Sequence, residues 1–165
     1  MSAKLKLYHP TSRGTGCAIG LELHPATAEQ EGSIILEMAH QRTVNGKDSE
    51  FDWSDTVCVR LGFNELTKIL QVFRGECEAI ENGIRKVYED HLAVIELRHV
   101  IEPVQGYQMV VTSQPRGAEG ADDRFVILFS SAEALAVCEA MTGAMVWVAF
   151  GDPHAPCRCA ERRAE

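Results

Sequence analysis

The stretch Asp55-Thr-Val-Cys-Val-Arg-Leu-Gly-Phe-Asn-Glu-Leu-Thr-Lys-Ile-Leu-Gln-Val-Phe73 changes its hydrophobic period at Gly62. Before that glycine, apolar and polar residues alternate, which predicts a half-buried strand ending at Leu61. After it, apolar residues recur every three or four positions, which predicts an amphipathic helix. This helix is expected to run to about Glu81, where Asn82-Gly83 would close it.

The same change of period occurs a second time. Arg124-Phe-Val-Ile-Leu-Phe129 is expected to be a strand, and Ser130-Ser-Ala-Glu133 is a capping box that starts a helix reaching about Phe150. Alternation predicts the remaining strands over residues 4–8, 17–24, 33–40, 84–88, 93–101 and 107–113. When Gly62–Glu65 is overlaid on Ser130–Glu133, the chain becomes a pseudo-twofold repeat. The sequence therefore predicts an α+β fold of four antiparallel strands plus one helix, repeated as ββββα-ββββα.

A chain of 165 residues with 45% hydrophobic and 24% charged residues is suited to one folded domain. We place that domain over residues 1–151, with repeat halves at about 4–82 and 84–150, and we expect 152–165 to be a flexible tail. The opening residues lack a signal peptide, and no apolar run is long enough to cross a bilayer. We therefore expect a cytoplasmic protein without membrane contact.

The charges and motifs exclude several classes of function. The 16 basic residues are outnumbered by 24 acidic ones, a formal net charge of −8, whereas proteins that neutralise a phosphate backbone are typically basic. No hydrolase, zinc-protease or phosphate-loop motif is present, so we expect neither an enzyme nor a cofactor. His154, Cys157 and Cys159 could hold a metal ion and support a metal-dependent switch or enzyme, but an exposed tail with two thiols is the preferred interpretation.

The polar faces of the predicted strands suggest a binding surface. They combine Arg, Gln and Thr with Glu, and aromatic residues at their margins could stack bases. The candidate aromatic residues are Tyr8, Trp53, Tyr88 and Tyr107. Two structural alternatives stay open. The charges could form cross-strand ion pairs on a solvated sheet, and Trp53 could be a core anchor.

Four stretches follow one another in a characteristic order: Gly32-Ser-Ile-Ile-Leu-Glu-Met-Ala39, Phe51-Asp-Trp-Ser54, Glu102-Pro-Val-Gln-Gly-Tyr107, and the Arg124–Phe129 strand with its capping box. In these stretches the chain resembles the Whirly family of single-stranded DNA-binding proteins. The similarity covers roughly residues 4–151 in order. It implies two roughly perpendicular four-stranded sheets and tetramers assembled through the helices. It also implies that single-stranded DNA, or RNA as in related mitochondrial proteins, lies along sheet edges between protomers.

The sequence departs from the family where plant members carry a lysine-glycine-lysine element. Those positions hold Gly16, Cys17 and Ala18, so both lysines are absent and the phosphate contacts must come from elsewhere. We select as nucleic-acid-binding residues the cations and aromatics of the predicted strands and their loops: Lys4, Lys6, Tyr8, Arg13, Arg42, Lys47, Trp53, Arg60, Arg98 and Tyr107.

The sequence therefore predicts a non-enzymatic protein that binds single-stranded nucleic acid with little sequence specificity. The predicted assembly is a homo-oligomer, specifically a tetramer formed through the helices, in a bacterial cytoplasm or nucleoid. The alternative is a protein-interaction or scaffold module of the same fold that has lost nucleic-acid binding, which the acidity and the missing lysines favour.

Overall fold

The computed structural model describes residues 4–43, 49–102, 105–116 and 122–152. The elements follow in the order β1 (Lys4–His9), β2 (Cys17–His24), β3 (Ser33–Thr43), β4 (Ser49–Leu61), α1 (Phe63–Phe73), β5 (Ile84–Val87), β6 (His91–Val100), β7 (Gly106–Pro115), β8 (Asp123–Ser130) and α2 (Ser131–Phe150). Each set of four consecutive strands forms one antiparallel sheet, in the order β1-β2-β3-β4 or β5-β6-β7-β8. The predicted ββββα-ββββα fold is therefore confirmed.

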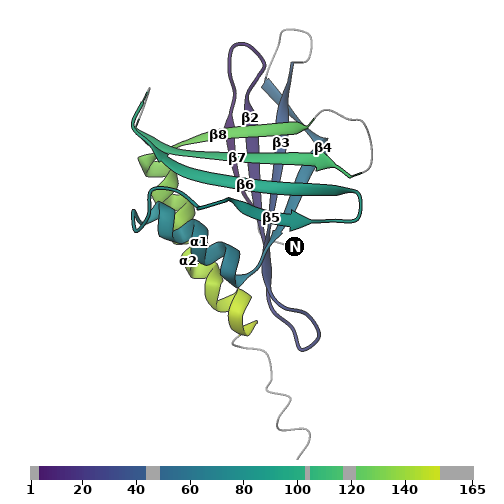
Figure 1. Cartoon of the computed structure of the whole chain (residues 1–165), viewed down its shortest axis with the longest axis vertical. Helices are drawn as coiled ribbons and strands as arrows, with labels where there is room; N and C mark the ends of the chain where they lie inside the picture. Colours follow the sequence, from purple (N-terminus) through teal and green to yellow (C-terminus); the bar gives the residue numbers. More distant parts are fainter. Residues whose placement is uncertain (1–3, 44–48, 103–104, 117–121, 153–165) are drawn as a thin grey trace, which may run out of the picture.

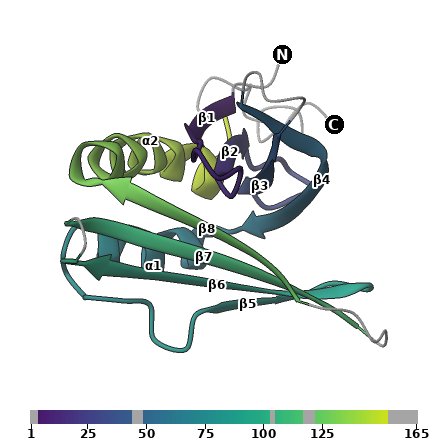
Figure 2. The same cartoon turned by 90° about the horizontal axis from the view of Figure 1, so that it is seen from above.

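The two sheets are layered crosswise. The strands of the second sheet run across those of the first, with β8 against β2 and β3 (Figure 1). Seen from above, α2 lies beside β1 and β2, whereas α1 lies along the second sheet (Figure 2). α1 contacts β4 and β6, and α2 contacts β2, β7 and β8, so each helix packs against both sheets, and the helices also contact each other.

A single hydrophobic core fills the space between these layers. The inner faces of both sheets and one side of each helix contribute to it, including the fully buried Leu36, Leu66, Phe125 and Phe129. Burial of a side chain of this size stabilises the fold by about 1.5–3 kcal/mol. Because period-2 alternation sends every second residue of the strands inward, the outer faces are left for other contacts.

Two histidine–carboxylate pairs connect the halves at the margin of the core. His40 Nε2 lies 2.8 Å from Asp123 Oδ1, and its ring stacks on Phe125 with centroids 4.1 Å apart. His9 Nε2 lies 3.2 Å from Glu133 Oε1 at the start of α2. The first pair joins β3 to β8, and the second joins β1 to the start of α2.

The two helix starts confirm the repeat at the level of single residues. Gly62 is the N-cap of α1, and its N–H donates to Glu65 Oε2 at 2.9 Å. Ser130 is the N-cap of α2, and its N–H donates to Glu133 Oε2 at 2.9 Å. Only Ser130 adds a side-chain cap, because glycine has no oxygen to accept the N–H of the third helical residue.

The predicted end of the first helix is wrong. α1 ends at Phe73 rather than near Glu81, and Gly75 follows with a φ of 71°. The chain then pairs with β6 through a hydrogen bond from Ile80 N–H to Leu97 O at 3.0 Å. The helical spacing of apolar residues extends past Phe73 in the sequence because Ile80 also packs against the core, although it does so from an extended segment. Asn82 and Gly83, both with positive φ, form the turn into β5 instead of closing a helix.

Replacing Ser130 with alanine should lower the free energy of unfolding by about 1 kcal/mol. The change removes the acceptor for the Glu133 N–H, which lies 3.3 Å from Ser130 Oγ. Urea titration followed by circular dichroism measures the effect. Ser131→Ala is the matched control, since Ser131 is exposed and lies one residue beyond the cap. Equal stability of the two variants would contradict this role of Ser130.

Candidate nucleic-acid interface

Three aromatic residues and one lysine gather on the outer face of the first sheet. The rings of Tyr8 and Phe51 have centroids 5.4 Å apart, and those of Tyr8 and Trp53 are 6.3 Å apart in an edge-to-face arrangement. Lys6 Nζ lies 4.1 Å from the centroid of the Trp53 ring, which is cation–π geometry. We call Lys6, Tyr8, Phe51 and Trp53 the outer cluster. Tyr8 is 50% exposed, so the outer cluster is accessible to a ligand.

A register irregularity between β3 and β4 brings Trp53 to this face. Ala39 pairs with Thr56, but Gln41 pairs with Phe51, so four residues of β4 are accommodated opposite one residue of β3. Such a bulge interrupts the strict alternation that would have sent Trp53 inward with Val57. The core-anchor alternative for Trp53 is therefore wrong.

Hydrogen bonds within the bulge hold its shape. Asp52 Oδ1 accepts from Ser54 Oγ at 2.5 Å and from Ser54 N–H at 3.2 Å. These bonds, with a smaller contribution from the charge of Arg42, lower the pKa of the Asp52 carboxyl. The carboxylate thus anchors the turn between the two aromatic residues of β4.

The outer cluster rests on small side chains. Ala18 of β2 and Ala39 of β3 pair with each other and are fully buried, although their positions alternate with the large side chains of the core. Two residues further along β2, a Cβ added at Gly20 would lie 3.6 Å from the Trp53 ring. The Trp53 ring therefore borders a position of β2 that carries no side chain, and Lys6 lies over the face of the same ring.

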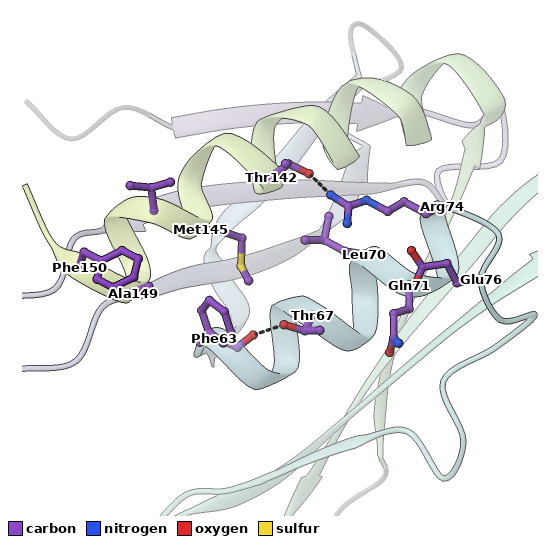
Figure 3. A pocket seen from close by; sticks show the side chains of 11 residues that line it. Phe63, Thr67, Leu70, Gln71, Arg74, Glu76, Thr142, Met145, Ala149 and Phe150 are labelled. Carbon is purple, nitrogen blue, oxygen red and sulfur yellow. Dashed lines mark hydrogen bonds between the residues drawn. The ribbon is translucent and has the colours of Figure 1, made fainter. Parts of the chain in front are cut away.

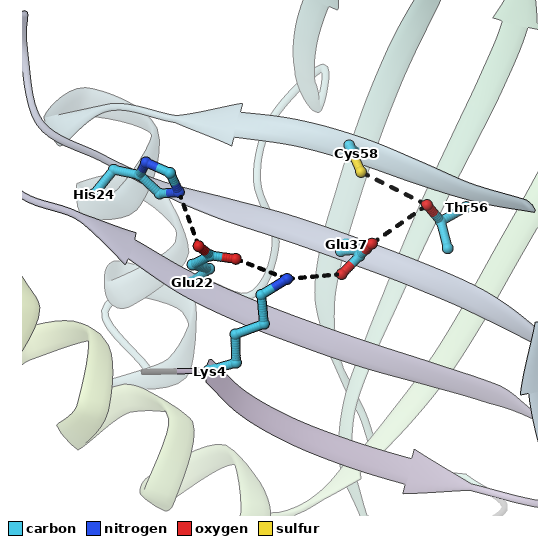
Figure 4. A network of polar contacts seen from close by, with 6 residues as sticks. All are labelled: Lys4, Glu22, His24, Glu37, Thr56 and Cys58. Carbon is cyan, nitrogen blue, oxygen red and sulfur yellow. Dashed lines mark hydrogen bonds and ion pairs between the residues drawn. The ribbon is translucent and has the colours of Figure 1, made fainter. Parts of the chain in front are cut away.

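A row of polar side chains crosses the sheet beside the outer cluster (Figure 4). Lys4 Nζ lies 2.7 Å from Glu22 and 3.6 Å from Glu37, and the hydrogen bond to Glu22 raises the pKa of Lys4. Thr56 Oγ1 donates to Glu37 at 3.5 Å. We call Lys4, Glu22, His24, Glu37, Thr56 and Cys58 the polar row.

The ion-pair alternative for the sheet charges applies to two of the selected cations, and hydrogen bonds hold a third. Lys4 is engaged in the polar row, and Arg42 Nη1 lies 3.7 Å from Asp52. Arg60 is held by Ser33 Oγ at 3.1 Å and by the Glu31 carbonyl at 2.5 Å, so it braces the loop before β3. Arg13 is exposed in the β1–β2 hairpin. Lys47 lies outside the described residues, as do His154, Cys157 and Cys159 of the tail.

The selected residues of the second sheet lie on opposite faces. Arg98 is on the outer face, where its guanidinium donates to Gln108 Oε1 at 2.6 and 3.0 Å. The Tyr107 ring packs edge-on against Phe73 on the helix side, and its hydroxyl donates to the Phe73 carbonyl at 3.3 Å. The structure thus brings together Lys6, Tyr8 and Trp53 and separates them from these two residues.

Two surface residues with suitable chemistry were missed in the selection. Phe51 belongs to the quoted aromatic-Asp-Trp stretch, but alternation alone does not show that both of its aromatic residues face outward. Arg124 is exposed on the outer face of β8, where alternation had placed it without indicating a role.

The two helices form an apolar groove (Figure 3). Its walls come from both helices, and Arg74 Nη2 donates across it to Thr142 Oγ1 at 2.9 Å. Phe63, Val146 and Phe150 are 48%, 50% and 83% exposed beside it. We call these lining residues the helix groove. By length and composition alone, α2 is long and apolar enough to cross a membrane. This differs from the sequence-based expectation that no apolar run of the chain is long enough to do so. One side of α2 is packed on both sheets.

The described residues offer little reactive chemistry. Burial raises the pKa of the Cys17 thiol to about 11, which keeps it protonated and unreactive. Within these residues, no group of three or more His, Cys, Asp or Glu side chains could hold a metal ion. The outer cluster is therefore the best-formed candidate site for a ligand in the described part of the chain.

Comparisons with known proteins identify the fold. No protein-family model matches the chain, and no curated protein matches it. Among solved structures it is similar to WHY1 from Arabidopsis thaliana, with a TM-score of 0.73 and 13% identity over 100% of this chain and 94% of that one. It is also similar to WHY3 from the same plant, with a TM-score of 0.73 and 15% identity over 99% of this chain and 98% of that one. The similarity to MRP1/MRP2 of Trypanosoma brucei has a TM-score of 0.60 and 12% identity over 94% of this chain and 100% of that one. The chain has the fold of the Whirly proteins.

Replacing Asp52 with alanine should loosen the outer cluster, because the bulge loses both of its Ser54 hydrogen bonds. In a Trp147→Phe background, which leaves Trp53 as the only tryptophan, we expect stronger acrylamide quenching and faster local rotation of the indole. Asp55→Ala is the control, since Asp55 lies in the same bulge and is exposed. If both variants keep the parental quenching constant, the carboxylate does not hold the bulge.

Proposed function

We propose that this protein binds single-stranded nucleic acid non-enzymatically, as a homo-oligomer. The observation that carries the proposal is the outer cluster, in which aromatic rings are held on a sheet surface beside an edge strand. Each base presents a π-face, so stacking on such rings is largely independent of sequence and contributes about 1–3 kcal/mol per base. The Whirly fold and the sequence resemblance support the same function.

The electrostatic contribution in this proposal is modest. Lys4 and Arg42 are already paired with carboxylates, which leaves Lys6 and Arg13 as the better placed cations of the first sheet. Fewer phosphate contacts mean weaker binding and a shallower dependence on salt. Stacking must therefore supply a larger share of the affinity than in a basic binding protein.

Assembly of several copies would compensate for the small number of cations. The helix groove exposes large apolar side chains that no other described part of the chain covers, and such surfaces are typical of association sites. Burying them between copies would bring several outer clusters onto one particle. A single strand that engages several of these clusters gains affinity without new contacts. The tetramer through the helices and the cytoplasmic location remain part of the proposal.

A scaffold function is the second candidate. It is favoured by the carboxylates of the polar row, which lie next to the rings and repel phosphate. The two functions differ in one measurement, since a scaffold would form oligomers without binding any oligonucleotide.

Native protein should bind fluorescent oligo-dT in about 50 mM salt at micromolar concentration or below. Trp53→Ala should weaken the affinity about tenfold because it removes one stacking partner. Lys6→Ala should reduce the slope of log affinity against log salt by about one, as expected for one phosphate contact. Lys68→Ala, an exposed lysine on α1, is the control and should leave both quantities unchanged. Absence of binding by the native protein would leave the scaffold function.

Phe63→Ser should dissociate the oligomer, because it places a polar group in the helix groove. Light scattering after size-exclusion chromatography gives the molar mass. Leu128→Ser is a matched control, since Leu128 is 46% exposed against 48% for Phe63 but lies on the second sheet, away from the helix groove. A Phe63→Ser variant that keeps the native mass would place the association surface elsewhere.

A further inference from the structure

The carboxylate of Glu37 and the indole of Trp53 both lie close to Gly20, a position of β2 without a side chain. A Cβ added at Gly20 would lie 3.6 Å from Glu37 Oε2 and 3.6 Å from two ring carbons of Trp53. The carboxylate and the indole therefore border the same small area of β2. A base held by the indole would have a hydrogen-bond acceptor within reach of its edge.

The charges are ordered across the strands. Lys6 lies on the edge strand β1, whereas Glu22 and Glu37, the two carboxylates beside Lys4, lie on β2 and β3. Phosphates are attracted to the edge and repelled from the interior of the sheet. A bound strand would therefore run its backbone along β1 and direct its bases over β2 toward β3.

Glu37 keeps the capacity to accept further hydrogen bonds. Lys4 lies closer to Glu22, at 2.7 Å, than to Glu37, at 3.6 Å. The bond from Thr56 is long, at 3.5 Å. An ionised carboxylate has two oxygens with about four acceptor positions, and these contacts leave some of them unused. Its side chain is 20% exposed, so it can be reached from solvent.

We propose that Glu37 and Trp53 form a base-reading subsite that favours guanine in the bound single strand. The Watson–Crick edge of guanine places two donors side by side, N1–H and the N2 amino group, which match the two oxygens of a carboxylate. Adenine and cytosine present one donor next to a ring acceptor, and thymine presents one donor between two carbonyls. Splayed bases of single strands are read on this edge.

In this subsite, Lys6 would move away from the Trp53 ring when a base binds. Its ammonium covers the Trp53 indole in the free protein, and a stacking base competes for the same face. The displaced ammonium remains on β1, where the backbone phosphates would lie. The exchange replaces a cation–π contact by stacking plus a phosphate contact. This subsite rests on the proposed function, which requires only stacking and no base preference.

The experiment compares T-rich oligonucleotides in which isolated thymines are replaced by guanine, by hypoxanthine or by adenine. Isolated guanines avoid quadruplexes. Fluorescence anisotropy in competition with labelled oligo-dT gives the affinities. We expect guanine to improve the affinity of native protein about fivefold or more per occupied subsite, the range of a bidentate contact. Hypoxanthine, which keeps N1–H but lacks the amino group, should lie between guanine and thymine.

Glu37→Gln should abolish the guanine preference, because the NH2 group of the amide is a donor that faces one of the two donors of guanine. Binding of oligo-dT should be equal or stronger, because the substitution removes a negative charge that repels phosphate. Glu96→Gln is the control: it removes the same charge from an exposed position of β6 in the other sheet and should keep the preference. Equal affinity of native protein for guanine and thymine strands would overturn the subsite but not the proposed function. A preference that survives Glu37→Gln would overturn the role of Glu37. Failure to bind any oligonucleotide would overturn both proposals.

Discussion

The burial of two crossed sheets in one core constrains the rest of this structure. Both sheets direct their alternating apolar residues inward, and β8 lies directly against β2 and β3. The inner faces are thus unavailable to any ligand. Only the outer faces, the sheet edges and the free sides of the helices remain, so each candidate function must be assigned to one of those surfaces.

The outer faces divide into regions of different chemistry. On the first sheet, aromatic rings gather with Trp53 beside Gly20, and a row of paired charges lies near them. On the second sheet, Arg98 is paired with Gln108 and Tyr107 is turned to the helix side. This asymmetry between the pseudo-twofold halves explains why the binding proposal concerns one sheet. The helices of both halves contribute to the helix groove, which fits the proposed assembly.

Much of the fold follows from local patterns. Alternation predicts the strands, and the capping box at Ser130 predicts the start of α2, because these signals depend on neighbours along the chain. The end of α1 is not predicted, since Ile80 satisfies a helical spacing while it packs from an extended segment beside β6. Of the selected residues, the structure brings Lys6, Tyr8 and Trp53 together on one surface, whereas Tyr107 packs against Phe73 on the helix side.

By itself, the sequence determined the order of the elements, the repeat of strands and helices, and the residues that face inward. It could do so because periodicity and capping are properties of short segments. Only the tertiary structure decided that the β4 bulge turns Phe51 and Trp53 outward, and which cations are bound by carboxylates. Those outcomes depend on the pairing register between strands and on distances between residues far apart in the chain, which no local pattern encodes.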